Sequence, residues 1–566
     1  MNYMDRYEFW CNADLPEETK AELNRIKDDV EELKGRFGSD LQFGTAGMRG
    51  IMGAGSNRLN RYTVRRAAQG MAAWLSSTGL PQKAAIGYDS RHNSQLFAEV
   101  CAVAFAEAGI ETWLYDRLAP TPMLSYAVRE LGCGCGIVIS ASHNAGEYNG
   151  VKCYGPDGCQ MTDGPAAIVT AKIAEIPYFI PETKTFDTYM AEGLISYIGQ
   201  DLWESYYKTV LAEAVEPDML KNAGLNIVYT PLCGTGNEPV REILGRLGVN
   251  ITVVECQEKP DGDFKTCEYP NPETDAALNE SYKVAQNAPC DVILGTDPDA
   301  DRVAIAVPDG FGGFRKLSGN ELGCMLMEYI LKARTARKDL CEGSEVVRSI
   351  VSSPLADRIA QSYGVAMKTV LTGFKYIGGE ILELEQIGQQ NRFVFGFEES
   401  CGYLKGTYAR DKDAVVASML VCEMAASIKL QGKTIIDALD EMYAKYGYYL
   451  AHVQSVELTG ADAMEKAAKM MADMRGNAPS AIGGALVTGI RDYQSGVATD
   501  LVTGAKENIN LPKSNVLEFL LGTKGSVIAR PSGTEPKVKF YYTAVGETKD
   551  AANKLLDAMI AQMSIA

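Results

Sequence analysis

Short apolar runs, each followed by a polar loop that contains glycine, recur along the chain and limit the folds open to it. Residues 137–139 precede one such loop and residues 84–88 precede another, and several of the segments between them have helical apolar spacing. Apolar runs of this length are typical of buried strands, and strands that alternate with helices are typical of βαβ units. The pattern therefore predicts an α/β fold whose ligand-binding loops follow the ends of strands.

The length of the chain indicates several domains. At ~150 residues per domain, 566 residues suggest about four of them. We expect three mixed α/β domains, with sheets flanked by helices, and then a smaller α+β domain. Changes in the pattern place the boundaries at 1–215, 216–317, 318–446 and 447–566.

The charge of the chain limits its partners. Its 73 Asp and Glu residues exceed its 55 Lys and Arg residues, which gives a net charge of −18, and no dense basic run interrupts this balance. Such a protein repels nucleic acid and anionic membrane surfaces. We expect no nucleic-acid or membrane partner, and any anionic substrate must be bound by a few gathered cations.

Cysteine usage and the N-terminus indicate where the protein works. The 14 cysteines are scattered along a long chain, which is typical of reduced thiols. Cys133 and Cys135 resemble half of a metal site, but two buried side chains at the start of a strand are the favoured interpretation. Residues 1–14 lack the order of a signal peptide, and the apolar run 414–422 is too short to cross a membrane. We expect a cytoplasmic protein in which 414–422 is a buried helix.

An amphipathic helix is predicted near the N-terminus. Asp14 and Glu17 have the spacing of a capping box, and Leu23, Ile26, Val30 and Leu33 then recur at helical intervals.

The polar segment after residues 137–139 carries Ser142 and extends to Gly158. A loop at the end of a buried strand can present the Ser142 hydroxyl to a ligand while the sheet holds it in place. Alternatively, Ser-His-Asn before alanine and glycine is a turn whose side chains bond their own backbone. Residues 41–50 form a second glycine-rich loop around Arg49, which could bind an anion or be an ordinary turn.

Three carboxylates stand at alternate positions between two apolar strands, in the run Asp297-Pro298-Asp299-Ala300-Asp301-Arg302. Like charges at this spacing repel one another unless a cation neutralises them, and a hard divalent ion with open coordination positions, such as Mg²⁺, is the simplest answer. A calcium loop is excluded because Arg302 and Pro308 occupy the positions of its glycine and its bidentate glutamate. A solvated acidic turn is the alternative.

Three further loops have polar side chains suited to a sugar phosphate. Thr372 to Tyr376 and Gly396 to Gly402 combine hydroxyl, amine and carboxylate groups beside glycines. Arg530 to Lys537 combines arginine, two hydroxyls and an unhindered glycine amide, which can surround a phosphate. Each loop alone is also compatible with a plain turn.

Taken together, the serine, aspartate, Gly-Phe-Glu-Glu-Ser and Arg-Pro-Ser-Gly-Thr-Glu-Pro segments resemble, in content and order, the loops of the α-D-phosphohexomutase family. The resemblance covers nearly the whole chain and implies four domains around a central cleft. It implies a phosphoserine at Ser142, and Mg²⁺ held by Asp297, Asp299, Asp301 and the phosphoryl oxygen on Ser142. The catalytic set also includes Arg49, His143 and Lys152, with Lys152 a proton carrier. The substrate-binding set implied is Arg302, Thr372, Gly373, Lys375, Glu398, Ser400, Lys412, Arg530, Ser532, Gly533 and Thr534.

The activity that the resemblance implies is that of a phosphoglucomutase. It interconverts glucose 1-phosphate and glucose 6-phosphate, with glucose 1,6-bisphosphate as intermediate and activator, in a monomer or weak homo-oligomer. Alternatives are a phosphomannomutase, a phosphopentomutase, a non-catalytic phosphosugar-binding protein and a metal-dependent phosphatase. The family commonly has threonine and proline where this chain has Ser140 and Ala145, so we expect a less rigid serine loop.

Overall fold

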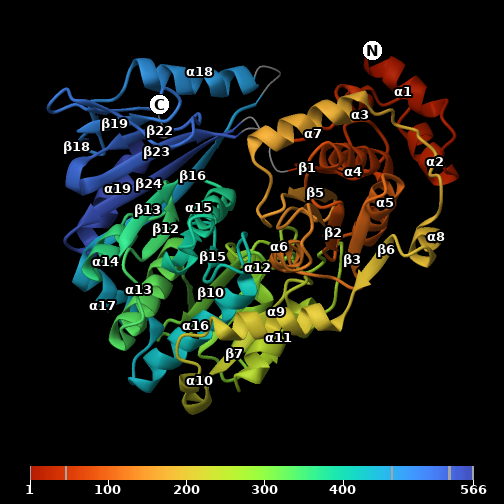
Figure 1. The fold of residues 1–566 in the computed structure, drawn as a ribbon. Helices are drawn as coiled ribbons and strands as arrows, with labels where there is room; N and C mark the ends of the chain where they lie inside the picture. The colour runs from red at the N-terminus through yellow and green to blue at the C-terminus, as the bar shows by residue number, and fades with distance from the viewer. Residues whose placement is uncertain (1, 45–46, 460–462, 533–536, 564–566) are drawn as a thin grey trace. The chain divides into compact units, whose positions relative to one another are not determined.

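The computed structural model describes residues 2–44, 47–459, 463–532 and 537–563, which form four mixed or antiparallel sheets with flanking helices and one short hairpin (Figure 1). The prediction of an α/β fold is confirmed. The chain forms two compact units, Met1–Gly319 with Ile377–Gly396 and Ser400–Gln431, and Asn320–Tyr376 with Phe397–Glu399 and Gly432–Ala566. We refer to them as unit 1 and unit 2.

The first sheet has the order β1-β5-β4-β2-β3-β6. Strands β2, β3, β4 and β6 run parallel, whereas β5 is antiparallel to β4 and β1 is antiparallel to β5. The βαβ prediction therefore holds for this part of the chain. The strands are β1 (Gly47–Ile51), β2 (Lys83–Tyr88), β3 (Glu111–Tyr115), β4 (Cys135–Ile139), β5 (Tyr148–Tyr154) and β6 (Ile195–Ile198). The helices are α4 (Arg61–Ser76), α5 (Ser94–Glu107), α6 (Thr121–Glu130), α7 (Asp163–Glu175), α8 (Phe186–Ala191) and α9 (Gln200–Ala212).

The second sheet has the order β11-β10-β9-β7-β8. Its centre is parallel, and β10 turns back antiparallel to β9, so that the aspartate run lies in the tight turn between two buried strands. The strands are β7 (Asn226–Thr230), β8 (Asn250–Val253), β9 (Val292–Thr296), β10 (Val303–Pro308) and β11 (Phe314–Lys316). The helices are α10 (Asp218–Ala223), α11 (Asn237–Arg246) and α12 (Asp275–Ala285), with the 3-10 turn η1 (Glu255–Gln257).

The third sheet has the order β13-β12-β14-β15. Helix α16 is capped by Asp413, which accepts the N–H groups of Val415 and Val416, and it is buried from Ala414 to Ala426, as predicted. The strands are β12 (Glu345–Ser349), β13 (Ala366–Val370), β14 (Phe393–Glu398) and β15 (Gly402–Leu404). The helices are α13 (Gly319–Arg337), α14 (Leu355–Ser362), α15 (Phe374–Gln386), α16 (Ala414–Leu430) and α17 (Ile435–Tyr446), with η2 (Gln390–Arg392).

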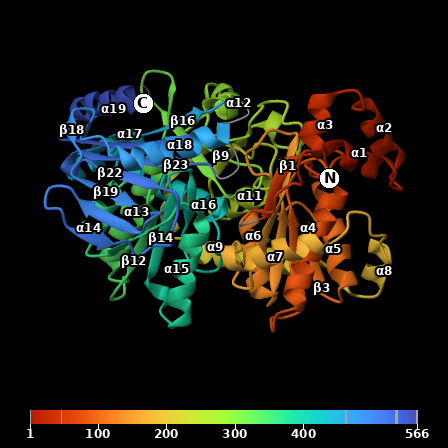
Figure 2. The same cartoon turned by 90° about the horizontal axis from the view of Figure 1, so that it is seen from above.

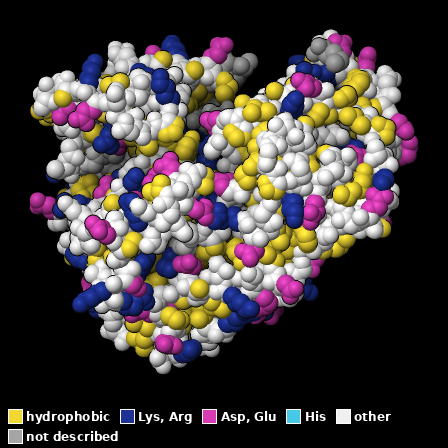
Figure 3. All heavy atoms as spheres, viewed as in Figure 1, with side chains coloured by type: hydrophobic (Ala, Val, Ile, Leu, Met, Phe, Trp, Pro, Cys, Tyr) yellow, Lys and Arg dark blue, Asp and Glu magenta, His cyan; other side chains and the backbone are white. Residues whose placement is uncertain are grey.

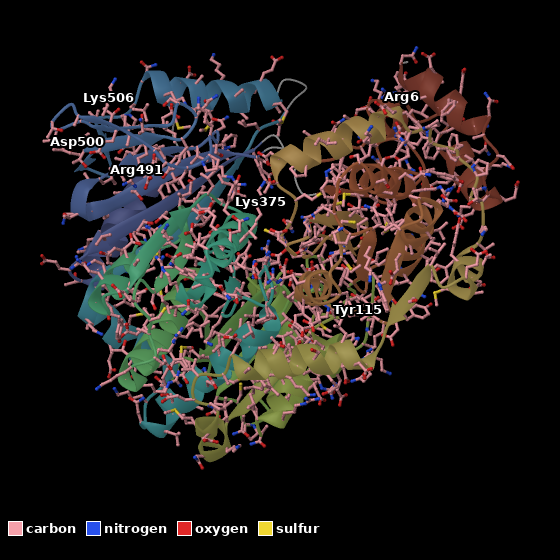
Figure 4. All side chains as sticks on the ribbon, in the orientation of Figure 1. Arg6, Tyr115, Lys375, Arg491, Asp500 and Lys506 are labelled. Carbon is pink, nitrogen blue, oxygen red and sulfur yellow. The ribbon has the colours of Figure 1, made fainter. Side chains whose placement is uncertain are left out.

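The fourth sheet is antiparallel, in the order β16-β24-β23-β22-β19-β20-β21, and carries Arg491, Asp500 and Lys506 (Figure 4). Alternate residues of its strands face two cores: Phe540 and Tyr542 pack with α18 and α19, whereas Tyr541 packs with Ile350 and Leu371. The strands of this sheet are β16 (Tyr448–Glu457), β19 (Gly489–Asp492), β20 (Val497–Asp500), β21 (Lys506–Asn508), β22 (Leu517–Leu520), β23 (Gly525–Pro531) and β24 (Lys537–Gly546). The short hairpin consists of β17 (Ala481–Ile482) and β18 (Ala485–Leu486). The helices are α18 (Ala463–Gly476) and α19 (Lys549–Met563), with η3 (Gly522–Lys524).

The predicted N-terminal helix is wrong in two respects. It is split into α2 (Glu17–Arg25) and α3 (Val30–Phe37), and these pack beside α1 (Tyr3–Cys11) at the N-terminal end of unit 1 (Figure 2). The residue before α2 is Pro16, which makes no side-chain cap, so Asp14 forms no capping box. Asp29 breaks the pattern by accepting the N–H groups of Glu31 and Glu32 at the start of α3, and Val30 is left 49% exposed.

Among the described residues, a single helix long and apolar enough to cross a membrane is not found. Helices α16 and α17 meet the criteria of length and composition only as a pair, bent by 89°. On the face drawn in Figure 3, basic and acidic side chains are intermixed.

Candidate active site

Ser142 lies in a tight loop between two antiparallel strands. Strand β4 ends at Ile139 and β5 begins at Tyr148, so the predicted loop up to Gly158 is too long and Lys152 belongs to a strand. The Ser142 side chain is buried, its N–H donates to Oγ of Ser140 at 2.8 Å, and its φ is +52°. A non-glycine residue adopts this left-handed conformation only where its surroundings hold it there.

The aspartate turn meets this serine. Ser142 Oγ donates to Oδ2 of Asp297 at 2.7 Å, although the two residues are 155 positions apart. Asp297 Oδ1 accepts the N–H groups of Asp301 and Arg302 at 3.1 and 3.0 Å, which holds the turn closed. One carboxylate oxygen from each of Asp297, Asp299 and Asp301 lies within 4.8 Å of the others, and all three residues are buried.

The donor set fits a hard metal ion. Asp299 Oδ1 and Asp301 Oδ1 are buried and have no hydrogen-bond partner among the residues that the structure describes. Burial, together with Asp299 and Asp301, raises the pKa of Asp297 well above its ordinary value. Oxygen ligands with unused lone pairs and excess negative charge are what a divalent cation binds.

Two lysines lie against the carboxylates. Lys152 Nζ is 2.5 Å from Asp299 Oδ2 and 3.3 Å from Asp301 Oδ2, and Lys412 Nζ is 3.0 Å from Asp301 Oδ2. Burial opposes the charged form of Lys152, but the coulombic attraction of Asp299 and Asp301 outweighs it, so the pKa of Lys152 is raised. Both ammonium groups therefore add positive charge beside the aspartates.

The other three residues predicted in this region lie around the same loops. His143 Nδ1 is 3.2 Å from Ser142 Oγ; burial, with Arg302 and Arg49, holds the pKa of His143 well below its ordinary value, so its ring is neutral. Arg302 pairs with Glu273 at 2.7 Å. Arg49 lies in β1 opposite Gly150, not in a glycine-rich loop as predicted, and donates to Asn144 Oδ1 at 3.0 Å.

The two segments predicted to bind the sugar, Thr372 to Tyr376 and Gly396 to Gly402, contain shorter loops than expected. Most of their candidate site residues belong to unit 2. Phe374 to Tyr376 already belong to α15, so Lys375 lies in the first turn of a helix (Figure 4), and Gly396 to Glu398 belong to β14. Glu398 Oε1 accepts the N–H of Gly373 at 2.7 Å, and the buried Thr372 Oγ1 has no partner among the described residues. Ser400 is half-buried in the turn after β14 and falls in unit 1.

The phosphate loop begins at the end of β23. Arg530 lies opposite Lys539 of β24, and the Ser532 N–H donates to the carbonyl of Lys537 at 2.8 Å. Burial, with Glu399, raises the pKa of Tyr541 to about 12, while Arg530 opposes this shift, so Arg530 and Glu399 share one neighbourhood within unit 2. Gly533 and Thr534 lie outside the described residues.

Four parts of the chain match the domain models of one protein family. The α/β/α domains I, II and III and the C-terminal domain of phosphoglucomutase/phosphomannomutase match residues 40–178, 204–311, 318–446 and 488–562. The chain belongs to the phosphoglucomutase/phosphomannomutase family. It is therefore an enzyme of the mutase class, and the predicted family is confirmed.

Relatives of this family cover almost the whole chain. A phosphoglucomutase of Staphylococcus epidermidis is 36% identical over 531 residues, 94% of this chain and 95% of the relative. One from Staphylococcus aureus (strain MSSA476) is 36% identical over 536 residues, 94% of both chains. The fold is shared with a putative phosphomannomutase from Thermus thermophilus (TM-score 0.69, 21% identity, 93% of this chain and 99% of that chain). It is also shared with the phosphoglucomutase parafusin of Paramecium in its open form (TM-score 0.66, 16% identity, 93% and 94%).

Two polar residues that the sequence analysis did not identify contact residues of the candidate site. Thr121 donates its hydroxyl to Asp299 Oδ2 at 2.8 Å and its N–H to the Asp299 carbonyl at 2.9 Å. Asp411 accepts from Lys412 Nζ at 3.0 Å and from the Tyr154 hydroxyl at 2.8 Å. Asp411 could have been identified from the sequence because it is adjacent to the predicted site residue Lys412. Thr121 could not, because it is 178 residues from Asp299 and the two meet only in the folded chain.

Proposed function

We propose that this protein interconverts glucose 1-phosphate and glucose 6-phosphate through a phosphorylated Ser142 and bound glucose 1,6-bisphosphate. The observation that carries the proposal is the 2.7 Å contact between the Ser142 hydroxyl and Asp297 within a buried carboxylate cluster. The relatives that bear the name phosphoglucomutase at 36% identity support the choice of sugar.

In the proposed reaction, the P–O bond to Ser142 breaks as a bond forms between phosphorus and a hydroxyl oxygen of the sugar. The proton lost by that hydroxyl is balanced by the proton that the Ser142 oxygen regains, and we assign its transfer to Lys152. In the second half, the other phosphoryl group of the bisphosphate returns to Ser142. The enzyme thus ends each cycle phosphorylated, and no water or phosphate is consumed.

The residues around Ser142 supply position and charge, which phosphoryl transfer requires more than covalent chemistry. Asp297, Asp299 and Asp301 are proposed to hold Mg²⁺, which, when bound, neutralises negative charge on the transferring group. Arg49, Arg302, Lys152 and Lys412 add positive charge to the same neighbourhood, and the neutral His143 lies beside the Ser142 oxygen.

The non-reacting end of the substrate is assigned to the other loops. Lys375 stands in the first turn of α15, where its ammonium group and the positive end of the helix dipole favour an anion, and Arg530 offers a guanidinium to a phosphate. Thr372, Gly373, Glu398 and Ser400 are proposed to bind sugar hydroxyls, and Ser532, Gly533 and Thr534 the phosphate. The proposed division into domains is that of the sequence: serine loop in 1–215, metal loop in 216–317, sugar loop in 318–446 and phosphate loop in 447–566.

The test is the intact mass of the purified protein before and after treatment with Mg²⁺ and glucose 1,6-bisphosphate. Protein isolated without phosphate on serine should gain one phosphoryl group, and Ser142→Ala should gain none. Ser77→Ala is the matched control, because it removes a serine hydroxyl that donates to the Trp74 carbonyl at the end of α4 and leaves the Ser142 loop intact. A phosphoryl group on Ser142→Ala, or its absence on wild type, contradicts the proposal.

The family description also names phosphomannomutase, which gives the second candidate function. Turnover of mannose 1-phosphate and glucose 1-phosphate should be compared at equal concentration, with free phosphate measured alongside. A higher kcat/KM for mannose 1-phosphate reverses our choice of sugar, and net release of phosphate contradicts a mutase.

A further inference from the structure

In the segment that carries Ser142, four backbone carbonyls accept hydrogen bonds from a single side chain, that of Arg91. Arg91 donates through Nη2 to the carbonyls of Ser142, at 2.6 Å, and of Asn144. Through Nη1 it donates to those of Ala145, at 2.7 Å, and Tyr148, at 3.0 Å. A single guanidinium, with five N–H donors in a rigid plane, therefore binds both ends of the loop.

Arg91 is itself fixed in place. Its side chain is fully buried, and Nε lies 3.4 Å from Oδ2 of the equally buried Asp89. Asp89 Oδ1 accepts the Arg91 N–H at 3.0 Å and the Ser94 hydroxyl at 2.7 Å. The ring of Phe264 covers the guanidinium at 4.9 Å. Burying a charged group is costly unless it is hydrogen-bonded, and four carbonyls of the loop accept the hydrogen bonds of Nη1 and Nη2, so the loop and Arg91 depend on one another.

The position of Arg91 follows from the sheet. Strands β2 and β4 are parallel neighbours, Tyr88 lies opposite Ile139, and the Asp89 N–H donates to the Ile139 carbonyl at 3.0 Å. Asp89 and Arg91 therefore follow β2 at the edge where the serine loop follows β4. The guanidinium reaches the loop through its backbone carbonyls and makes no contact with the reacting hydroxyl.

The hydrogen bonds of Arg91 hold the backbone of Ser142, which has a positive φ. Ser142 has a φ of +52°, its N–H is held by Ser140 Oγ, and its carbonyl is held by Arg91. We infer that Arg91 is a positioning residue for phosphoryl transfer, which fixes the backbone of Ser142 so that Oγ faces Asp297; this inference rests on the proposed function. Arg91 donates to loop carbonyls and is not assigned any contact with the sugar or its phosphates.

Loss of positioning has a specific kinetic signature. A displacement of about 1 Å at the nucleophile costs about 10²-fold in rate, whereas groups that bind the substrate elsewhere are unaffected. We expect Arg91→Lys to lower kcat by about 10²-fold and to change KM by less than about threefold. Arg91→Ala should lose more, and added guanidinium ion should restore part of its rate.

Arg66 provides the matched control. It is a largely buried arginine on α4, donates to the carbonyls of Ile176 at 2.8 Å and Ile173 at 3.0 Å, and stacks on Tyr178 at 3.9 Å. Arg66→Lys should lower the midpoint of thermal unfolding, as Arg91→Lys does, but leave kcat within about twofold of wild type. This separates positioning from general loss of stability.

The experiment measures two quantities on wild type, Arg91→Lys and Arg66→Lys. The first is the single-turnover rate of phosphoryl transfer from glucose 1,6-bisphosphate to Ser142. The second is hydrogen exchange of the 140–148 amides, which requires no activity. Slower transfer together with faster exchange in Arg91→Lys alone supports the inference.

Three outcomes overturn it: a wild-type transfer rate in Arg91→Lys, unchanged exchange at 140–148, or an equal loss of rate in Arg66→Lys. If wild type itself accepts no phosphoryl group, the proposed function fails, and the exchange measurement still decides whether Arg91 holds the loop.

Discussion

At the scale of single residues, the site is defined by negative charge that the fold gathers and leaves partly unsatisfied. Asp297, Asp299 and Asp301 are buried together, and two of their oxygens lack a hydrogen-bond partner among the described residues. Repulsion and desolvation destabilise the apoprotein at this cluster, and a bound divalent ion relieves both.

Asp297→Asn should therefore separate stability from metal binding. We expect the metal-free variant to be at least as stable as wild type, because it replaces a carboxyl group whose ionisation is disfavoured by burial and by Asp299 and Asp301. The rise in thermal midpoint caused by Mg²⁺, worth about 2.7 kcal/mol at one hundred times its Kd, should be lost, and activity should fall by at least about 10²-fold. Calorimetric or fluorescence melting with EDTA and with Mg²⁺ measures this.

Asp309→Asn is the control, since the Asp309 side chain accepts the N–H groups of Phe311 and Gly313 in the β10–β11 turn. It should keep the Mg²⁺-induced shift. A full shift in Asp297→Asn contradicts metal binding at this cluster.

Sequence patterns could identify the residues that carry charge but not those that hold them. The Ser142 and aspartate segments are distinctive in composition, and each follows a recognisable strand, so their meeting could be predicted. Arg91 lies in the polar loop after residues 84–88, and no local pattern in the sequence marks it as a site residue. Its role depends on β2 and β4 being neighbours, and the order of strands in a sheet cannot be predicted from the local hydrophobic pattern.

At the scale of elements, close packing decides where the chain tolerates a side chain. Helix α15 contains adjacent glycines with opposite surroundings. A Cβ on Gly378 would lie 2.6 Å from the Arg410 carbonyl and 2.8 Å from Cys159 Sγ, whereas one on Gly379 would meet nothing within 4 Å.

We expect opposite effects from the two substitutions. Gly379→Ala should raise the free energy of unfolding by about 0.5–1 kcal/mol, because it reduces the backbone entropy of the unfolded chain. Gly378→Ala should lower it by about 1–3 kcal/mol, because the overlap with a backbone carbonyl forces the helix to shift. Urea unfolding curves measure both, and equal effects at the two sites contradict the packing described.

Helix α16 carries a buried carboxyl group at Glu423. Its Oε2 accepts the Val215 N–H at 2.9 Å, which ties the segment after α9 to α16. Burial raises the pKa of Glu423 to about 7, against the opposing effect of the Val215 and Glu216 amides. Between pH 4.5, the ordinary pKa of the group, and about pH 7, Glu423 therefore keeps a proton in the folded state that it has released in the unfolded state.

The free energy of unfolding should therefore fall as pH rises through this window, by about 3 kcal/mol from this group, and the loss should persist above pH 7. Glu423→Gln removes the ionisation. We expect its stability relative to wild type to improve from about pH 4.5 to about pH 7 and then to level off, as measured by urea unfolding at fixed ionic strength. A difference that does not change with pH contradicts the buried, protonated state.

The elements themselves were largely predictable where their signal is strong. Buried strands such as β4, β9 and β10, and the apolar helix α16, follow directly from uninterrupted apolar runs. The N-terminal helix was wrong because Asp29 caps a new helix in the middle of a continuous apolar period. Strands β1 and β5 were missed because their glycines and polar residues resemble loops, and only their pairing with one another and with β4 makes them strands.

At the scale of the whole molecule, the chain forms two compact units, and its tryptophans divide unevenly between them. All four, Trp10, Trp74, Trp113 and Trp203, belong to unit 1. Intrinsic tryptophan fluorescence therefore reports the unfolding of unit 1, whereas far-UV circular dichroism reports the helices and strands of both units. Chains with several domains commonly unfold in more than one step.

We expect a denaturant transition in circular dichroism that tryptophan fluorescence does not follow. Met71 in α4 and Met471 in α18 are fully buried, one in each unit, so their replacement by alanine should cost a similar amount, about 2–5 kcal/mol. Met71→Ala should move the fluorescence transition to lower urea concentration. Met471→Ala should move only the transition seen by circular dichroism, because its cavity lies in the core that α18 and α19 form with the fourth sheet. Superimposable curves from both probes, or an equal shift of fluorescence by both variants, would show that the two units unfold as one.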